Sequence, residues 1–151
     1  MRTTASRLAV LFAAQVLLAA QALSAERDAP SPAIAVIVGH TSFVTDVSKD
    51  QLRELYLRRQ RLWPNGARAI PINLPPDSHV RERFARLVLG RSSEDLIAYW
   101  NARYFEGVTP PVVLPSASAV RAYLAAEPAA IAYLPVPDVD ASCRVLLVLG
   151  E

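Results

Sequence analysis

The sequence predicts a small α/β domain, and three observations support this prediction. The chain has 151 residues, which is enough for one domain of ordinary size. Short apolar runs typical of strands alternate along the chain with segments whose apolar residues recur at helical spacing. The composition, 52% hydrophobic and 20% charged, excludes a disordered tail, a collagen-like repeat and a heptad-rich coiled coil. We therefore expect strands and helices packed in layers.

The first 25 residues have the three-part layout of a secretory signal peptide. Arg2 and Arg7 form a short positive region, an apolar run follows over residues 8–22, and small residues lead up to Ala25. A membrane anchor is the alternative. However, the run is short and contains two glutamines, whereas a membrane span needs about 20 apolar residues. We therefore predict a signal peptide over residues 1–25, cleavage near Ala25, and a periplasmic or secreted protein without a stable membrane anchor.

Removal of this segment changes the charge balance. The whole chain has 16 basic and 14 acidic residues, a formal net charge of +2. Residues 1–25 contain two of the basic residues and none of the acids, so the remaining 151 − 25 = 126 residues carry 14 of each sign. The basic pI of the whole chain therefore does not indicate a nucleic-acid partner, and export also argues against one. We expect a lead-in linker over residues 26–32 and one domain over residues 33–150.

The first part of this domain predicts two strands and one helix. Residues 33–38 form a continuous apolar run, typical of a buried strand. Ser48 and Gln51 have the spacing of a capping box, which predicts the start of a helix with an apolar face at i, i+3 and i+4. A Trp-Pro-Asn-Gly turn follows the helix and precedes a second predicted strand over residues 69–74.

The rest of the domain predicts three helices and two strands. One helix begins at Asp77 or Ser78 and is closed by Gly90, which is a frequent helix terminator. The later elements are read from serine caps, apolar spacing and proline breaks: a helix from Ser92 or Ser93, a helix from Ser116 or Ser118 to Pro128, and strands over residues 130–134 and 144–149.

Neither a catalytic constellation nor a metal or cofactor motif stands out. The sequence has no Gly-x-Ser-x-Gly elbow, HExxH pair or P-loop, so we expect no enzyme activity, no cofactor and no metal. The single cysteine, Cys143, excludes a disulfide framework and a multi-cysteine zinc site. We expect it to be a buried thiol, with a catalytic thiol as the alternative. Four aromatic side chains are expected in the core: Trp63, Trp100, Tyr104 and Phe105.

Several segments resemble, in their order and spacing, the phosphate-type substrate-binding proteins of ABC importers. The serine-initiated helix at residues 47–57 and the turn at residues 61–66 look like the family's helix and Trp-x-(Asp/Asn)-Gly turn. The segment at residues 77–84 resembles the family's next helix, and residues 127–134 are similar to its Asn-Pro-Gly-Ala-Ile-Gly-Tyr-Val strand. The resemblance covers most of residues 33–150 and is best to the small, single-lobe members of the family.

This resemblance implies both a fold and a function. The implied fold is α/β: a single lobe of a type II periplasmic-binding-protein-like fold, with a mixed sheet flanked by helices. The implied function is that of an exported substrate-binding-like protein for phosphate or a related oxyanion, as an orphan or accessory of ABC-type phosphate uptake. The sequence departs from the family where Arg58-Arg59 replaces a Gly-Lys pair, and where residues 75–79 replace a glycine-rich phosphate loop.

The candidate ligand site is the amino end of the helix that begins near Asp77. Free N–H groups and the positive end of the helix dipole suit an oxyanion there, with Ser78 donating a hydroxyl and Arg81 a fork of two N–H groups. The alternative is that Asp77 or Ser78 only caps the helix and that Arg81 is solvated. Thr41 and Ser42 are weaker candidates. They follow a strand, and ligands of open α/β sheets bind beyond strand ends, but they fit an ordinary loop equally well.

Positive charge is concentrated in the middle of the chain. Residues 51–91 contain nine arginines and three acids, and Arg58, Arg59 and Arg61 form the densest part. A basic face of this kind suits an anionic ligand or an acidic protein, although a solvated helix end is the simpler alternative. A second function therefore stays open: an envelope protein-interaction module that has kept the fold and lost ligand binding.

Overall fold

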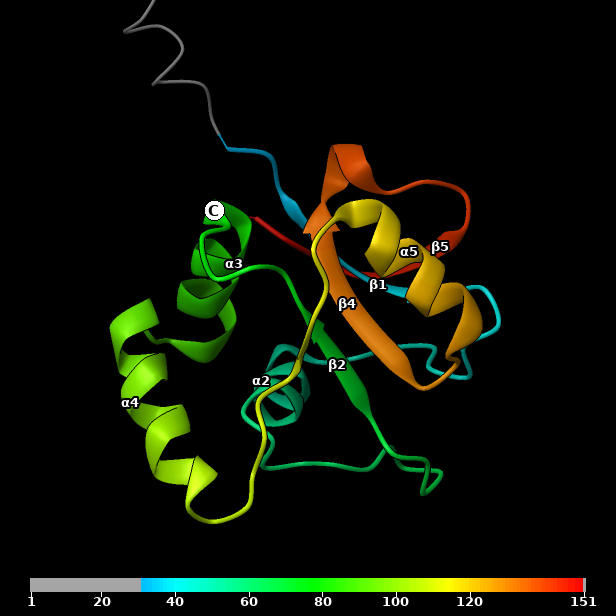
Figure 1. Cartoon of the computed structure of the whole chain (residues 1–151). Coiled ribbons are helices and arrows are strands. Elements are labelled where there is room, and N and C mark those ends of the chain that lie inside the picture. The colour runs from blue at the N-terminus through cyan, green and yellow to red at the C-terminus, as the bar shows by residue number, and fades with distance from the viewer. Residues whose placement is uncertain (1–30, 151) are drawn as a thin grey trace, which may run out of the picture. The chain divides into compact units, whose positions relative to one another are not determined.

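A five-stranded mixed sheet runs through the part of the chain that the computed structural model describes, residues 31–150 (Figure 1). The predicted signal peptide lies outside the described residues, as does most of the predicted lead-in. The strands are β1 (Ile34–Gly39), β2 (Ile70–Asn73), β3 (Val112–Val113), β4 (Ala130–Pro135) and β5 (Cys143–Leu149), in the spatial order β3-β2-β4-β1-β5. Four of them are the strands that the apolar runs predict, and β3 is additional.

Strand direction divides this sheet into two parts. β2 is parallel to both β3 and β4, whereas β1 is antiparallel to β4 and β5. Ile34, the first residue of β1, pairs with Pro135, the last residue of β4. The carboxyl ends of β2, β3 and β4 therefore lie together at one end of the sheet. The loop after β1 lies at the opposite end.

The described residues form four α-helices, and a serine caps the start of each of them. They are α2 (Lys49–Tyr56), α3 (His79–Phe84), α4 (Ser93–Tyr104) and α5 (Ala117–Ala126). The capping residues are Ser48, Ser78, Ser92 and Ser116. Each serine side chain accepts a hydrogen bond from the amide three residues later, which satisfies an N–H group that has no acceptor within the helix. These starts agree with the sequence prediction. No helix among residues 31–150 is long and apolar enough to cross a membrane.

The helix predicted up to Gly90 ends differently from the expected regular α-helix. Beyond α3 the chain continues as a π-helical turn, Ala85–Leu89. The amides of Gly90 and Arg91 both donate to the carbonyl of Ala85, so the last turn closes more widely than an α-helical turn. Gly90 has the left-handed conformation, with φ at 63°, which ends the helix as predicted.

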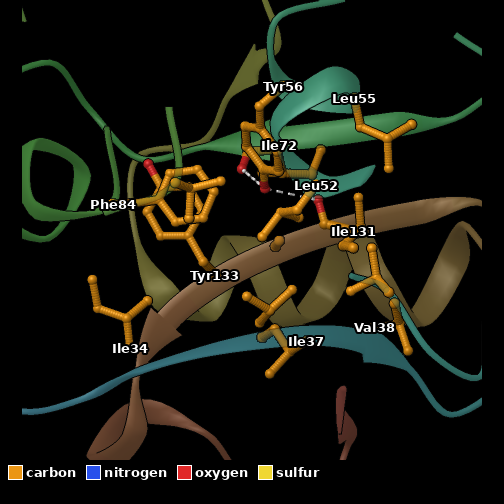
Figure 2. Close-up of a cluster of buried hydrophobic side chains, with 14 of the residues drawn as sticks. Ile34, Ile37, Val38, Leu52, Leu55, Tyr56, Ile72, Phe84, Ile131 and Tyr133 are labelled. Atoms are coloured by element: carbon orange, nitrogen blue, oxygen red, sulfur yellow. Dashed lines mark hydrogen bonds between the residues drawn. The ribbon is translucent and has the colours of Figure 1, made fainter. Parts of the chain in front are cut away.

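Three aromatic side chains connect α2, α3 and β4 in the core (Figure 2). The rings of Phe84 and Tyr133 stack with centroids 3.8 Å apart, and the ring of Tyr56 lies 4.7 Å from that of Phe84. The Tyr56 hydroxyl donates to the carbonyl of Ile72 in β2 at 2.9 Å, so this buried polar group is satisfied. The cluster fixes α2 and α3 against the parallel part of the sheet.

The expected burial of aromatic residues on α4 is partly wrong. Trp63 is buried and Trp100 is half-buried, but Tyr104 and Phe105 are 70% and 89% exposed. The face of α4 that packs against the protein consists of the buried Leu96 and the half-buried Tyr99, Trp100 and Arg103. Tyr104 lies one position beyond this face, and Phe105 follows the helix, so neither side chain reaches the core.

Alkaline pH should destabilise the protein through its buried phenols. Burial raises the pKa of both Tyr56 and Tyr133 above the ordinary value near 10. A group whose pKa is raised on folding contributes stability that is complete below its unfolded pKa and lost as pH rises toward the folded pKa. We expect the urea-unfolding free energy to fall slightly above about pH 8.5, where the Cys143 thiol of the unfolded chain ionises, and more steeply above about pH 10. Ultraviolet titration of the phenolates tests this, and two buried phenols that ionise near pH 10 without unfolding would contradict it.

Candidate functional site

A groove lies at the end of the sheet where the parallel strands finish. It has a volume of about 360 Å³. We call it the sheet-end groove. Its walls come from the segment between β2 and α3, from the start of α5, and from the end of β4 with the turn after it: Leu74, Pro75, Asp77, Ser78, Val80, Pro115, Ala117, Leu134, Pro135 and Asp138. Segments far apart in the chain meet there because β2, β3 and β4 run parallel.

Two helices begin at this groove. The Ser78 Oγ accepts a hydrogen bond from the amide of Arg81 at 3.4 Å, and the Ser116 Oγ accepts one from Ala119 at 3.2 Å. Each cap satisfies one amide, and the remaining amides of a first turn have no intrahelical acceptor. The positive ends of both helix dipoles therefore lie beside the groove, an arrangement that favours a bound negative charge.

The structure places Asp77 and Ser78 in the groove wall and Arg81 elsewhere. The Arg81 guanidinium donates from Nη1 to the carbonyl of Leu74 at 2.8 Å. Its side chain lines a separate pocket beside α4, which includes Trp100. The groove lining does not include the Arg81 side chain, so the expected fork of two N–H donors is not aimed at an anion there. The backbone of α3, rather than the arginine, is therefore the nearer source of donors.

Asp138 is the groove residue that the sequence did not suggest. It lies in a 3₁₀ turn, Val136–Asp138, directly after β4. An acidic residue shortly after the predicted strand at residues 130–134 was the available signal. Together with Asp77 it gives the groove two carboxylates, which accept hydrogen bonds and do not donate them when ionised. The groove thus combines backbone donors with carboxylate acceptors.

Thr41 and Ser42 lie at the other end of the sheet. They follow β1, which is antiparallel to β4, so they are not brought to Ser78. The Ser42 hydroxyl is buried and donates to the carbonyl of Pro128 at 2.6 Å, while its oxygen accepts from the amide of Val44 at 3.2 Å. Ser42 therefore holds the loop after β1 against the segment that leads into β4.

The chain resembles several solved receptors in fold. It matches an ABC-type phosphate transport receptor from Vibrio cholerae with a TM-score of 0.62 and 18% identity, over 78% of this chain and 46% of that chain. A putative phosphate ABC transporter substrate-binding protein from Clostridium perfringens, solved with bound phosphate, matches with a TM-score of 0.63 and 18% identity, over 78% of this chain and 45% of that chain. PstS from Borrelia burgdorferi matches with a TM-score of 0.58 and 14% identity, over 78% of this chain and 47% of that chain. The chain is therefore similar in fold to part of these phosphate-type substrate-binding proteins.

The likeness covers part of those receptors. The chain spans less than half the length of the solved structures that it matches. No family model matches the sequence, and no curated protein does. The mixed sheet flanked by helices that the sequence predicts is confirmed, and it is similar in fold to part of these periplasmic-binding-protein-like structures.

The three arginines of the predicted basic face differ in exposure. Arg59 and Arg61 are exposed, and Arg59 pairs with Glu54 at 3.2 Å. Arg58 is only 8% exposed and does not lie on the surface. Its burial follows from the end of α2, where the chain turns inward at Arg58 with a positive φ of 58°.

Metal ligation and a reactive thiol are two other kinds of chemistry that the titratable groups of residues 31–150 could support. Within residues 31–150 no group of three or more His, Cys, Asp or Glu side chains is placed to hold a metal ion. Cys143 is buried, as the sequence predicts, and burial is the main cause that raises the pKa of its thiol. A raised pKa disfavours the thiolate form that a nucleophile needs.

Proposed function

We propose that the chain is an exported protein that binds phosphate or a related oxyanion in the sheet-end groove, as an orphan or accessory of ABC-type phosphate uptake. The observation that carries this proposal is the convergence of the starts of α3 and α5 on one groove, at the carboxyl ends of parallel strands. Fold likeness to a substrate-binding protein solved with phosphate supports it. The signal-peptide layout of residues 1–25 supports export to the periplasm.

The groove chemistry suits an oxyanion that carries a proton. First-turn amides of α3 and α5 donate to the anion oxygens, and the Ser78 hydroxyl adds a donor. Asp77 and Asp138 would repel a fully deprotonated anion but accept a hydrogen bond from a protonated oxygen. Hydrogen phosphate and hydrogen arsenate carry such a proton at neutral pH, and sulfate does not. We therefore expect phosphate and arsenate to bind more tightly than sulfate.

An aspartate at position 117 should block this site without damaging the helix. Ala117 is the first residue of α5 and lines the groove, so Ala117→Asp places a carboxylate where the anion would lie. Aspartate in a first turn favours the helix dipole, so unfolding is not expected. We expect calorimetry on the signal-free chain to show phosphate binding that weakens at least tenfold in Ala117→Asp.

A matched control uses the same charge change at another helix start. Ser93 is exposed and is the first residue of α4, so Ser93→Asp adds one negative charge away from the sheet-end groove. This variant should bind phosphate as tightly as the wild type. If the wild type binds none of phosphate, arsenate and sulfate at millimolar concentration, the ligand-binding function is refuted.

A second candidate function is an envelope protein-interaction module. The exposed arginines Arg59 and Arg61 favour it, because they leave positive charge on the surface after α2. Reversing both charges, as Arg59→Glu with Arg61→Glu, should then abolish recovery of an acidic envelope partner in a pull-down. Unchanged recovery would count against this function.

A further inference from the structure

We propose that Arg58 and Arg68 form a second anion-binding site, at the opposite end of the sheet from the sheet-end groove. The two side chains line a pocket of about 240 Å³, together with residues 69–71 at the start of β2 and residues 109–112, which lead into β3. Because β2 and β3 are parallel, this pocket lies at their amino ends, whereas the sheet-end groove lies at their carboxyl ends. Occupation of one site therefore does not obstruct the other. We call this second site, lined by Arg58 and Arg68, the Arg58 pocket.

The charge of Arg58 is buried and has no negative partner among residues 31–150. The residue is 8% exposed, and its Nη1 donates to the carbonyl of Ala69 at 3.3 Å. Its Nε is closed to solvent and has no hydrogen-bond partner in the described part of the chain. An arginine has five N–H donors, so most of its capacity is unused. A buried charge in this state is unfavourable until an opposite charge approaches it.

Neighbouring charges make the same site more positive. Arg58 and Arg68 are absent from the four ion pairs among residues 31–150, and no acidic side chain lines the pocket. Burial lowers the pKa of the Arg58 guanidinium, and the like charges of Arg68 and Arg61 lower it further. An anion between Arg58 and Arg68 would stabilise the charged guanidinium and so offset the effects of burial and of the two neighbouring arginines.

The backbone at Arg58 is also unfavourable for an arginine. With φ at 58°, Arg58 is the one non-glycine residue with a positive φ in the described part of the chain. Left-handed backbone is costly for a residue with a Cβ, and glycine would adopt it freely. Strained positions of this kind cluster at ligand sites. The burial of an unpaired charge and the strained backbone thus coincide at one side chain in a pocket.

The lining of the pocket indicates the class of ligand. Two guanidinium groups and the Thr109 hydroxyl suit an oxyanion, since arginine binds carboxylate and phosphate oxygens with paired donors. Pro110, Pro111 and Val112 supply an apolar wall. The volume exceeds the roughly 30 Å³ that one water occupies several times over, so a carbon body fits beside the anionic group. The predicted ligand is a small organic anion, with a carboxylate or phosphate-ester group.

Citrate is a suitable probe for a carboxylate ligand, and glycerol phosphate is a suitable probe for a phosphate-ester ligand. We expect at least one of them to raise the Tm of the signal-free chain by several degrees at millimolar concentration, compared with chloride at equal ionic strength. Arg68→Gln should weaken binding at least tenfold by calorimetry. Arg59→Gln is the matched control, because it removes the same charge one residue from Arg58 at an exposed side chain outside the pocket, and it should leave binding unchanged.

Two further variants test whether the anion binds in the Arg58 pocket itself. Ala117→Asp alters the sheet-end groove, so it should leave citrate or glycerol phosphate binding intact even where phosphate binding there is lost. Arg58→Gly relieves the backbone and removes the buried charge, so it should fold and lose the anion-dependent rise in Tm. No rise in the wild type with either probe would overturn the proposal. An equal rise in Arg58→Gly or Arg68→Gln would also overturn it.

Discussion

Replacement of Phe84 by alanine is expected to destabilise the protein by about 3–5 kcal/mol, a large part of the stability of an ordinary domain. The Phe84 side chain is 1% exposed and lies between two other core rings. Its ring stacks on Tyr133 at 3.8 Å and contacts Tyr56 at 4.7 Å (Figure 2). An alanine would leave a cavity between α2, α3 and β4 that rigid neighbouring rings cannot fill.

Urea unfolding followed by circular dichroism measures this effect. Phe105→Ala is the matched control, because it makes the same chemical change at a side chain that is 89% exposed. That variant should stay within about 0.5 kcal/mol of the wild type. Equal losses in the two variants, or a loss below about 1 kcal/mol for Phe84→Ala, would contradict the packing described for this cluster.

The parts of the fold that the sequence predicts well depend on neighbouring residues. Each helix start is marked by a serine whose side chain accepts from the amide three residues later, a signal contained within one turn. The continuous apolar run that becomes β1 is equally local, because a strand buried on both faces needs no polar alternation. These elements agree with the structure within one or two residues at most of their ends.

The features that escape prediction depend on distant parts of the chain. β3 has two residues and exists because Val112 and Val113 pair with β2, some 40 positions earlier in the sequence. The direction of β1 relative to β4 is likewise a property of the assembled sheet. That direction separates Thr41 and Ser42 from the groove, so the expectation that they form its second edge fails for a topological reason.

The candidate site is only half visible in the sequence for the same reason. Asp77 and Ser78 form a local signal before a helix, and the structure places both at the sheet-end groove. Asp138 and Ala117 come from the ends of other elements, and their approach depends on the parallel pairing of β2 and β4. The burial of Arg58 could not be read from a run of arginines, because charge spacing does not reveal a positive φ.

Gly39→Ala is expected to be the second severe substitution, at about 3 kcal/mol of destabilisation. A Cβ at Gly39 would lie 2.1 Å from the carbonyl oxygen of Leu124 in α5 and 2.8 Å from its carbonyl carbon. Both are backbone atoms, so no side-chain rotation relieves the overlap. Either β1 or α5 must shift, and the two elements are packed directly against each other. The glycine is needed here for close approach of two backbones.

Thermal unfolding tests this prediction, and Gly150→Ala is the control, because a Cβ at Gly150 meets nothing within 4 Å. At roughly 4 °C per kcal/mol for a domain of this size, Gly39→Ala should lower Tm by about 12 °C, whereas Gly150→Ala should not change it measurably. A shift of α5 would also displace Ala117 at the sheet-end groove. Phosphate affinity should therefore weaken in Gly39→Ala under conditions where the variant is still folded. An unchanged Tm would mean that β1 and α5 lie further apart than the structure places them.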